Sequence, residues 1–153
     1  MKILMVCLGN ICRSPIAEGV MRHKIQEHGL DWEVASAGTE SYHIGAAPHR
    51  FSQKICLQYG IDISHQCARK FDKKDFERYD KIYAMAADVY DEIKQIGGAG
   101  ADMGKVSLFL NELRPGSNDS VPDPWYGTER DYAPVFHMIA ETCDAIIGRY
   151  AGR

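Results

Sequence analysis

The sequence predicts an α/β fold with three layers, in which helices cover both faces of a four-stranded parallel sheet. Two observations predict this fold. Four short apolar segments rich in branched residues are typical of buried strands, and each precedes a stretch whose apolar residues recur at helical spacing. The simplest arrangement of four such units is a parallel sheet with right-handed crossovers. A length of 153 residues suits a single domain, expected to span 1–153.

The first strand and the first helix are joined by a loop that we expect to bind an anion. The apolar run 3–6 predicts the strand. A helix is expected over 14–28, because Ser14 and Pro15 are favoured at helix starts and Gly29 at a helix end. Backbone N–H groups and the positive end of the helix dipole then converge on the loop. The sequence therefore predicts a phosphate-binding loop after the first strand.

The remaining elements follow in the same alternating order. The glycine-rich stretch 97–100 lacks the lysine and hydroxyl residue of a nucleotide-binding loop, so it predicts a flexible break. Ligands of open parallel sheets bind beyond the carboxyl ends of the strands, where Cys7, the turn 36–39 and Asp123 are expected to meet. The predicted strands are 32–39, 81–85 and 105–110, and the predicted helices are 48–59, 88–96 and 129–150.

Composition excludes several classes of protein. A net charge of −3 without a run of lysines or arginines argues against a nucleic-acid partner. No apolar stretch approaches the ~20 residues of a membrane span, and the N-terminal segment lacks the pattern of a signal peptide. Five cysteines, an odd number in a chain that can build its own core, predict reduced thiols and a cytoplasmic protein. A monomer is the default expectation.

Cys7 at the end of the first strand and Arg13 at the start of the helix can face the same bound anion. A helix N-terminus and a nearby arginine stabilise a thiolate, so we expect Cys7 to be a nucleophile rather than a buried apolar residue. The planar Arg13 side chain can pair with two phosphate oxygens. Asn10 is expected at positive φ. Ser14 either only caps the helix or also donates to the Cys7 sulfur.

Three motifs carry a resemblance to one family. Cys7–Leu8–Gly9–Asn10–Ile11–Cys12–Arg13–Ser14–Pro15 resembles the active-site loop of the low-molecular-weight protein tyrosine phosphatases. The resemblance extends to Ser36–Ala37–Gly38–Thr39 and to Asp123–Pro124–Trp125–Tyr126–Gly127, so it covers nearly the whole chain. A Cys-(x)5-Arg motif alone is moderately specific. Together with the later Asp-Pro-aromatic-Tyr-Gly motif it is highly specific.

The resemblance implies an enzyme that hydrolyses phosphotyrosine through a cysteinyl-phosphate intermediate. Cys7 would attack phosphorus, Arg13 and the loop amides would hold the phosphate oxygens, and Asp123 would act as general acid and then as base. Without that motif, Asp123 would be taken for a turn residue before proline. No metal or other cofactor is needed, because the thiolate supplies the nucleophile and Arg13 the positive charge. The other substrate-binding residues of the loop are Leu8, Gly9, Asn10, Ile11, Cys12 and Ser14.

Four residues favour an aryl phosphate as substrate. By the resemblance, Trp125 and Tyr126 would form aromatic walls, and Tyr42 stands where the family often has an aromatic residue on the opposite rim. Similar enzymes that act on phosphoarginine have a threonine at the position of Ile11, so this apolar residue favours a phenyl ring. The implied partner is a tyrosine-phosphorylated protein, such as the autophosphorylated tyrosine kinases on which bacterial relatives often act.

The roles of several cysteines and histidines stay open or are minor. By the resemblance, Cys12 either forms a reversible disulfide with Cys7 or is a buried thiol without a redox role. No second Cys/His pair completes a zinc site with these two thiols. Ser36 and a histidine are expected to orient the loop asparagine and serines, and counting from the two flanks places either His65 or Gln66 there. We expect Cys56, Cys67 and Cys143 in the core, and His23, His28, His43, His49 and His137 in solvent.

Two other functions fit parts of the sequence. An arsenate reductase of the same fold would need a relay of further cysteines late in the chain, where Cys143 stands alone within a predicted helix. A phosphotyrosine-binding module without catalysis is disfavoured by the intact set of Cys7, Arg13 and Asp123. Thioredoxin-coupled arsenate reduction without aryl-phosphatase activity would identify the first alternative, and tight phosphopeptide binding without turnover would identify the second.

Overall fold

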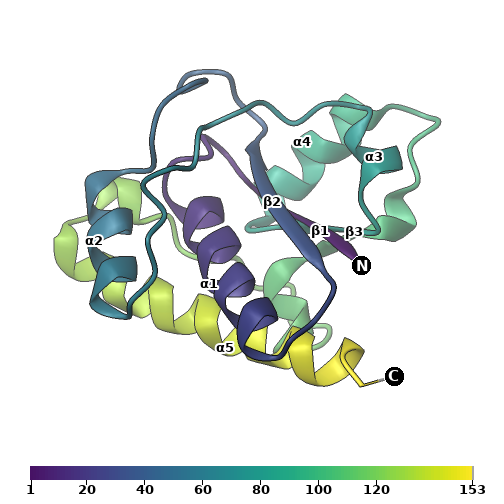
Figure 1. The fold of residues 1–153 in the computed structure, drawn as a ribbon. Helices are drawn as coiled ribbons and strands as arrows, with labels where there is room; N and C mark the ends of the chain where they lie inside the picture. Colours follow the sequence, from purple (N-terminus) through teal and green to yellow (C-terminus); the bar gives the residue numbers. More distant parts are fainter. Residues whose placement is uncertain (153) are drawn as a thin grey trace.

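The structure is a computed structural model that describes residues 1–152, and it confirms the predicted four-stranded parallel sheet (Figure 1). The spatial order of the strands is β2-β1-β3-β4, and all three neighbouring pairs are parallel. The first strand is central, which places its carboxyl end in the middle of one edge of the sheet. The strands are β1 (Lys2–Cys7), β2 (Glu33–Gly38), β3 (Lys81–Ala84) and β4 (Val106–Leu108).

Helices cover both faces of the sheet and create two apolar cores. One core joins α1, α2 and α5 to one face of the sheet, and the other joins α3 and α4 to the opposite face (Figure 1). Strand β1 contributes Ile3 and Met5 to the first core, and Leu4 and Val6 to the second. Residues 3–6 of β1 are buried on both faces of the sheet and are all apolar, which is why the sequence of this strand shows no alternation. The helices are α1 (Arg13–Glu27), α2 (Arg50–Gln58), α3 (Asp75–Arg78), α4 (Ala87–Gly97) and α5 (Tyr132–Tyr150).

Three elements differ from the sequence-based prediction. The strand expected over 105–110 ends at Leu108 and continues as a 3₁₀ helix, Phe109–Glu112. Phe109 and Leu110 are both buried in the core that contains residues of α1 and α5, whereas consecutive residues of a strand would point to opposite faces. The last helix begins at Tyr132 after a separate 3₁₀ turn. The four-residue helix α3 was not expected, because one turn is too short to show a helical period.

Gly38 allows the phosphate loop to lie directly against the end of β2. A side chain here would place its Cβ 2.8 Å from the Leu8 carbonyl oxygen and 3.0 Å from the Asn10 nitrogen. Backbone N–H groups after the glycine hold the loop, since Thr39 donates to the Cys7 carbonyl over 3.0 Å and Glu40 to the Leu8 carbonyl over 2.9 Å. The fold therefore fixes the loop from β2 as well as from β1 and α1.

Across residues 1–152, none of the helices combines the length and the apolar character that crossing a membrane requires.

Candidate active site

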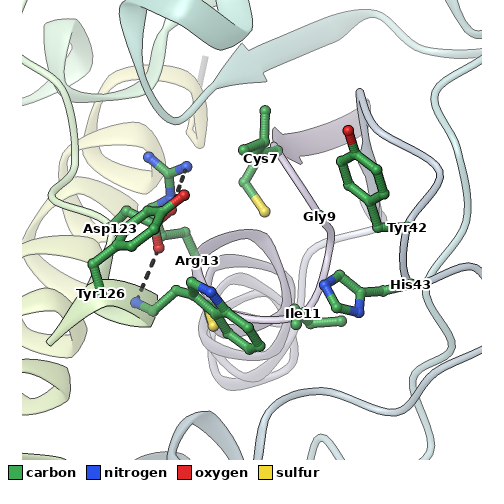
Figure 2. Close-up of a pocket in the computed structure, with 11 residues that line it drawn as sticks. Cys7, Gly9, Ile11, Arg13, Tyr42, His43, Asp123 and Tyr126 are labelled. Atoms are coloured by element: carbon green, nitrogen blue, oxygen red, sulfur yellow. Dashed lines mark hydrogen bonds and ion pairs between the residues drawn. The ribbon is translucent and has the colours of Figure 1, made fainter. Parts of the chain in front are cut away.

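The loop after β1 forms the floor of a pocket at the carboxyl end of the sheet. Cys7 is the last residue of β1 and Arg13 the first of α1, and both side chains are buried. Asn10 adopts a φ of +57°, as its place in the turn predicts. In Figure 2 the Cys7 sulfur points into the pocket, with Asp123 and Tyr126 on one side and Tyr42 and His43 on the other. The pocket is lined by Cys7, Leu8, Gly9, Ile11, Cys12, Arg13, Tyr42, His43, Asp123, Trp125 and Tyr126.

A chain of buried hydrogen bonds begins at Cys7. Ser14 Oγ lies 3.0 Å from Cys7 Sγ, and Asn10 Nδ2 donates to Ser14 Oγ over 2.8 Å and to Ser36 Oγ over 2.9 Å. Ser14 Oγ accepts from Asn10, so its own hydrogen can go either to Cys7 Sγ at 3.0 Å or to the Ala37 carbonyl at 3.5 Å. The contact with the sulfur is the shorter one, which favours donation from Ser14 to Cys7. Ser14 does not cap the helix, since α1 already starts at Arg13.

The far end of this chain is a buried carboxylate that sequence reasoning missed. Ser36 Oγ donates to Glu18 Oε1 over 2.7 Å, and Arg22 donates to Glu18 Oε2 over 2.7 Å. A carboxylate can only accept hydrogen bonds, so Ser36 must donate to it and accept from Asn10. Glu18 lies among the mostly apolar positions of α1 that face inward, and this place on the helix was the only signal in the sequence.

His65 is not the residue that orients Asn10. The His65 side chain is exposed, and within residues 1–152 no hydrogen bond joins it to the loop. Gln66 lies nearer, but its Nε2 donates to the Pro15 carbonyl over 3.1 Å. Asn10 Oδ1 instead accepts from the Arg69 backbone N–H over 3.1 Å, which fixes the orientation of the amide. The role expected of a histidine is divided between this backbone group and the Glu18–Ser36 pair.

Asp123 reaches the loop although 110 residues separate it from Arg13. Its Oδ2 lies 3.5 Å from Arg13 Nη2, and its Oδ1 accepts from the Trp125 backbone N–H over 3.1 Å (Figure 2). Arg13 Nη1 also donates to the Val121 carbonyl over 3.1 Å, and Val121 N–H donates to the Met85 carbonyl at the end of β3. The segment that carries Asp123 is therefore tied to both the phosphate loop and the sheet.

The mouth of the pocket carries exposed aromatic side chains. Tyr42 is 80% exposed, Tyr126 81% and Trp125 46%, whereas Ile11 beside them is buried. His43 and His49, which we expected in solvent, are partly buried next to Trp125. The sequence around these two histidines shows no periodicity that would predict their partial burial. Their contacts with Trp125 join segments that are distant in the chain.

The cysteines of the structure are free thiols in different surroundings. Burial raises the pKa of Cys12 to about 11 and that of Cys56 to about 12, and it also raises the pKa of Cys143. Cys12 Sγ lies 3.5 Å from the Tyr132 hydroxyl. Cys67 is exposed, contrary to expectation, and its thiol donates to the Gly45 carbonyl over 3.3 Å. Cys12 therefore remains a neutral thiol in the pocket at neutral pH.

Comparison with known proteins gives one consistent result. The family model described as low molecular weight phosphotyrosine protein phosphatase matches residues 2–151. A putative low molecular weight protein-tyrosine-phosphatase of Synechocystis is 36% identical over 149 residues, 96% of this chain and 94% of the relative. PtpA of Staphylococcus epidermidis is 37% identical over 147 residues, 95% of this chain and 90% of the relative. A Drosophila arginine phosphatase structure superposes with a TM-score of 0.91 at 27% identity, covering 99% of both chains.

Proposed function

Since the chain belongs to the low molecular weight phosphotyrosine protein phosphatase family, we propose that it hydrolyses protein phosphotyrosine through a cysteinyl-phosphate on Cys7. One observation carries this proposal above all. The buried Cys7 and Arg13 share one loop, and Asp123 lies 3.5 Å from Arg13 at the open side of the same pocket. A nucleophile, an anion-binding cation and a proton donor are thus gathered around one small volume.

In the first step the Cys7 thiolate attacks phosphorus and the bond from phosphorus to the tyrosine oxygen breaks. Asp123, as the carboxylic acid, gives its proton to the departing phenolate oxygen. Arg13 and the backbone N–H groups of the loop stabilise the charge on the three equatorial oxygens. Tyrosine leaves, the phosphoryl group stays on the sulfur, and Asp123 becomes a carboxylate.

In the second step water takes the place that tyrosine has left. Asp123 accepts a proton from the water while the water oxygen attacks phosphorus, and the sulfur–phosphorus bond breaks. Inorganic phosphate leaves and the thiolate returns. The hydroxyl of Ser14, 3.0 Å from the sulfur, donates to the thiolate as it departs and so lowers the cost of this step.

The shape of the pocket supports an aryl substrate. Ile11 presents a branched apolar side chain at the floor, and Tyr42, Trp125 and Tyr126 border the mouth. A phenyl ring can lie between such walls, whereas the guanidinium of phosphoarginine would leave its N–H groups without partners at Ile11. We therefore expect phosphotyrosine to be hydrolysed faster than phosphoarginine.

Hydrolysis of phosphotyrosine peptides by purified protein tests this function. Cys7→Ser is expected to abolish turnover, while Cys67→Ser, which changes an exposed thiol outside the pocket, is expected to leave it unchanged. Asp123→Ala is expected to lower kcat by ~10²–10⁴-fold and to preserve phosphate binding. Turnover that survives Cys7→Ser, or faster hydrolysis of phosphoarginine than of phosphotyrosine, would refute the proposal.

The proposed physiological partner is a tyrosine-phosphorylated protein of the cytoplasm, such as a bacterial tyrosine kinase. Free thiols, two of them beneath the phosphate site, suit a reducing compartment. Asp123→Ala should retain bound substrate and allow its capture. The three thiols outside the loop offer little support for arsenate reduction, because Cys56 and Cys143 are buried in separate helices and Cys67 lies at the surface.

A further inference from the structure

Two imidazole rings pack against Trp125, which lies two residues after Asp123. The ring centroids of His43 and Trp125 are 5.6 Å apart, and those of His49 and Trp125 are 5.4 Å apart with the rings nearly perpendicular. His43 belongs to the segment after β2, and His49 is the N-cap of α2. Figure 2 shows His43 on the side of the pocket opposite Asp123. We call this pair of rings, His43 and His49, the tryptophan seat.

His49 is fixed by contacts with three other parts of the fold. Its backbone N–H donates to the Ile11 carbonyl in the phosphate loop over 2.7 Å. Its Nδ1 accepts from the Phe51 N–H over 3.1 Å and lies 3.4 Å from the Tyr132 hydroxyl, whose ring stacks on the imidazole. Since Nδ1 accepts, the ring is neutral and carries its hydrogen on Nε2. Burial and the nearby Arg50 lower the pKa of His49, which agrees with a neutral ring.

The seat acts on the proton donor through Trp125. The Trp125 backbone N–H donates to Asp123 Oδ1, so a shift of Trp125 moves the carboxylate. We propose that His43 and His49 are positioning residues that hold Trp125 and, through it, place Asp123 over the leaving oxygen. This inference rests on the proposed function, because it assigns the seat a part in protonating the leaving group.

Two substitutions at His49 separate its ring from its hydrogen bond. His49→Asn keeps a side-chain acceptor for the N-terminus of α2 and removes the ring, whereas His49→Phe keeps a ring and removes the acceptor. Both are made in a Trp32→Phe background, where Trp125 is the one remaining indole of the chain. His28→Asn, at an exposed position after α1, is the matched control. Quenching of Trp125 fluorescence by acrylamide then reports on the seat without any turnover.

Catalysis is compared on phenyl phosphate and p-nitrophenyl phosphate. Phenolate is a poor leaving group that needs the proton from Asp123, whereas nitrophenolate leaves readily without it. With His49→Asn we expect steeper quenching of Trp125 and a loss of about 2- to 10-fold in kcat/KM for phenyl phosphate, the range for one lost aromatic pair. The loss for p-nitrophenyl phosphate should be smaller, and inhibition by inorganic phosphate should not change. His49→Phe should unfold at a lower temperature, because the hydrogen-bond acceptor is lost. Its quenching of Trp125 by acrylamide and its ratio of kcat/KM for the two substrates should stay near those of the wild type.

Three results would refute the positioning role of the seat. Acrylamide could quench Trp125 in His49→Asn no more than in the control, or His49→Asn could lower kcat/KM equally for the two substrates. The third is a His49→Phe variant whose ratio of the two kcat/KM values changes as much as that of His49→Asn. Should His49→Asn fail to fold, His43→Ala in the same background provides the same comparison from the other ring. A wild type that hydrolyses neither phosphate ester would overturn the proposed function, while the quenching results would still decide whether the two rings hold Trp125.

Discussion

Glu18 orients the Ser36 hydroxyl that lies beneath Asn10. Its carboxylate accepts from Ser36, so the Ser36 oxygen is left to accept from Asn10. Asn10 donates to Ser14 whatever residue stands at position 18, because its Oδ1 accepts from the Arg69 N–H and its amide nitrogen can only donate. A neutral amide in place of Glu18 would accept less strongly from Ser36 or would donate to it, and Ser36 would then hold Asn10, and with it Ser14, less firmly.

Glu18→Gln is therefore expected to slow alkylation of Cys7 by iodoacetamide at pH 7 and to lower kcat for an aryl phosphate. The substitution also leaves the Arg22 guanidinium without its buried anionic partner, which should cost about 1–3 kcal/mol of unfolding free energy. Glu27→Gln, at an exposed position on the same helix, is the control. Alkylation at the wild-type rate in Glu18→Gln would mean that Ser14 does not depend on this carboxylate.

At the scale of elements, the close approach of the phosphate loop to β2 depends on one missing side chain. Gly38→Ala would place a Cβ 2.8 Å from the Leu8 carbonyl oxygen, and neither backbone can move without breaking the bonds from residues 39 and 40. We expect a loss of about 1–3 kcal/mol in denaturant unfolding and a fall in activity. Gly148→Ala in α5 meets no atom within 4 Å and should stabilise the helix by about 0.5–1 kcal/mol. Equal stability of the two variants would contradict this account.

The elements that the sequence predicts best are those whose signals are local. The strand before Cys7, the turn at Asn10 and the start of α1 follow from neighbouring residues, and the structure agrees with them to within one residue. The end of β4 was predicted wrongly for a non-local reason. Phe109 and Leu110 both turn into a core that is formed by residues of other helices, and the strand sequence alone does not show that core. The same reason explains the sites that were missed. Glu18 meets Ser36, and His43 and His49 meet Trp125, only because the fold brings together residues that are distant in the sequence.

At the scale of the whole molecule, the buried thiols should make the free energy of unfolding fall at alkaline pH. An unfolded cysteine ionises with a pKa of about 8.5, whereas burial raises the pKa of Cys12 to about 11 and that of Cys56 to about 12. Above pH 9 the unfolded chain releases protons that the folded chain keeps, so the free energy of unfolding falls as pH rises toward 12. Each thiol contributes roughly 2 kcal/mol or more to this loss.

Urea unfolding at pH 8 to 11 under reducing conditions measures this dependence. Cys56→Ala removes one buried thiol away from the pocket and should make the fall in unfolding free energy shallower. Cys67→Ser removes an exposed thiol and should leave the fall unchanged. If both variants follow the wild-type curve, the alkaline loss has another origin, such as the buried hydroxyls of Tyr83 and Tyr132, whose pKa values burial also raises.

The contact between Cys12 and Tyr132 joins residues 120 positions apart, and the Arg13–Asp123 pair spans 110. Contacts between such distant positions close large loops and tend to form late when a chain folds. The phosphate loop can thus form early between β1 and α1, while Asp123, the proposed proton donor, reaches it only when residues 121–123 dock on Arg13 and on the end of β3. In a refolding experiment, enzyme activity should therefore return later than the helical circular dichroism signal. The delay would report when these distant segments meet.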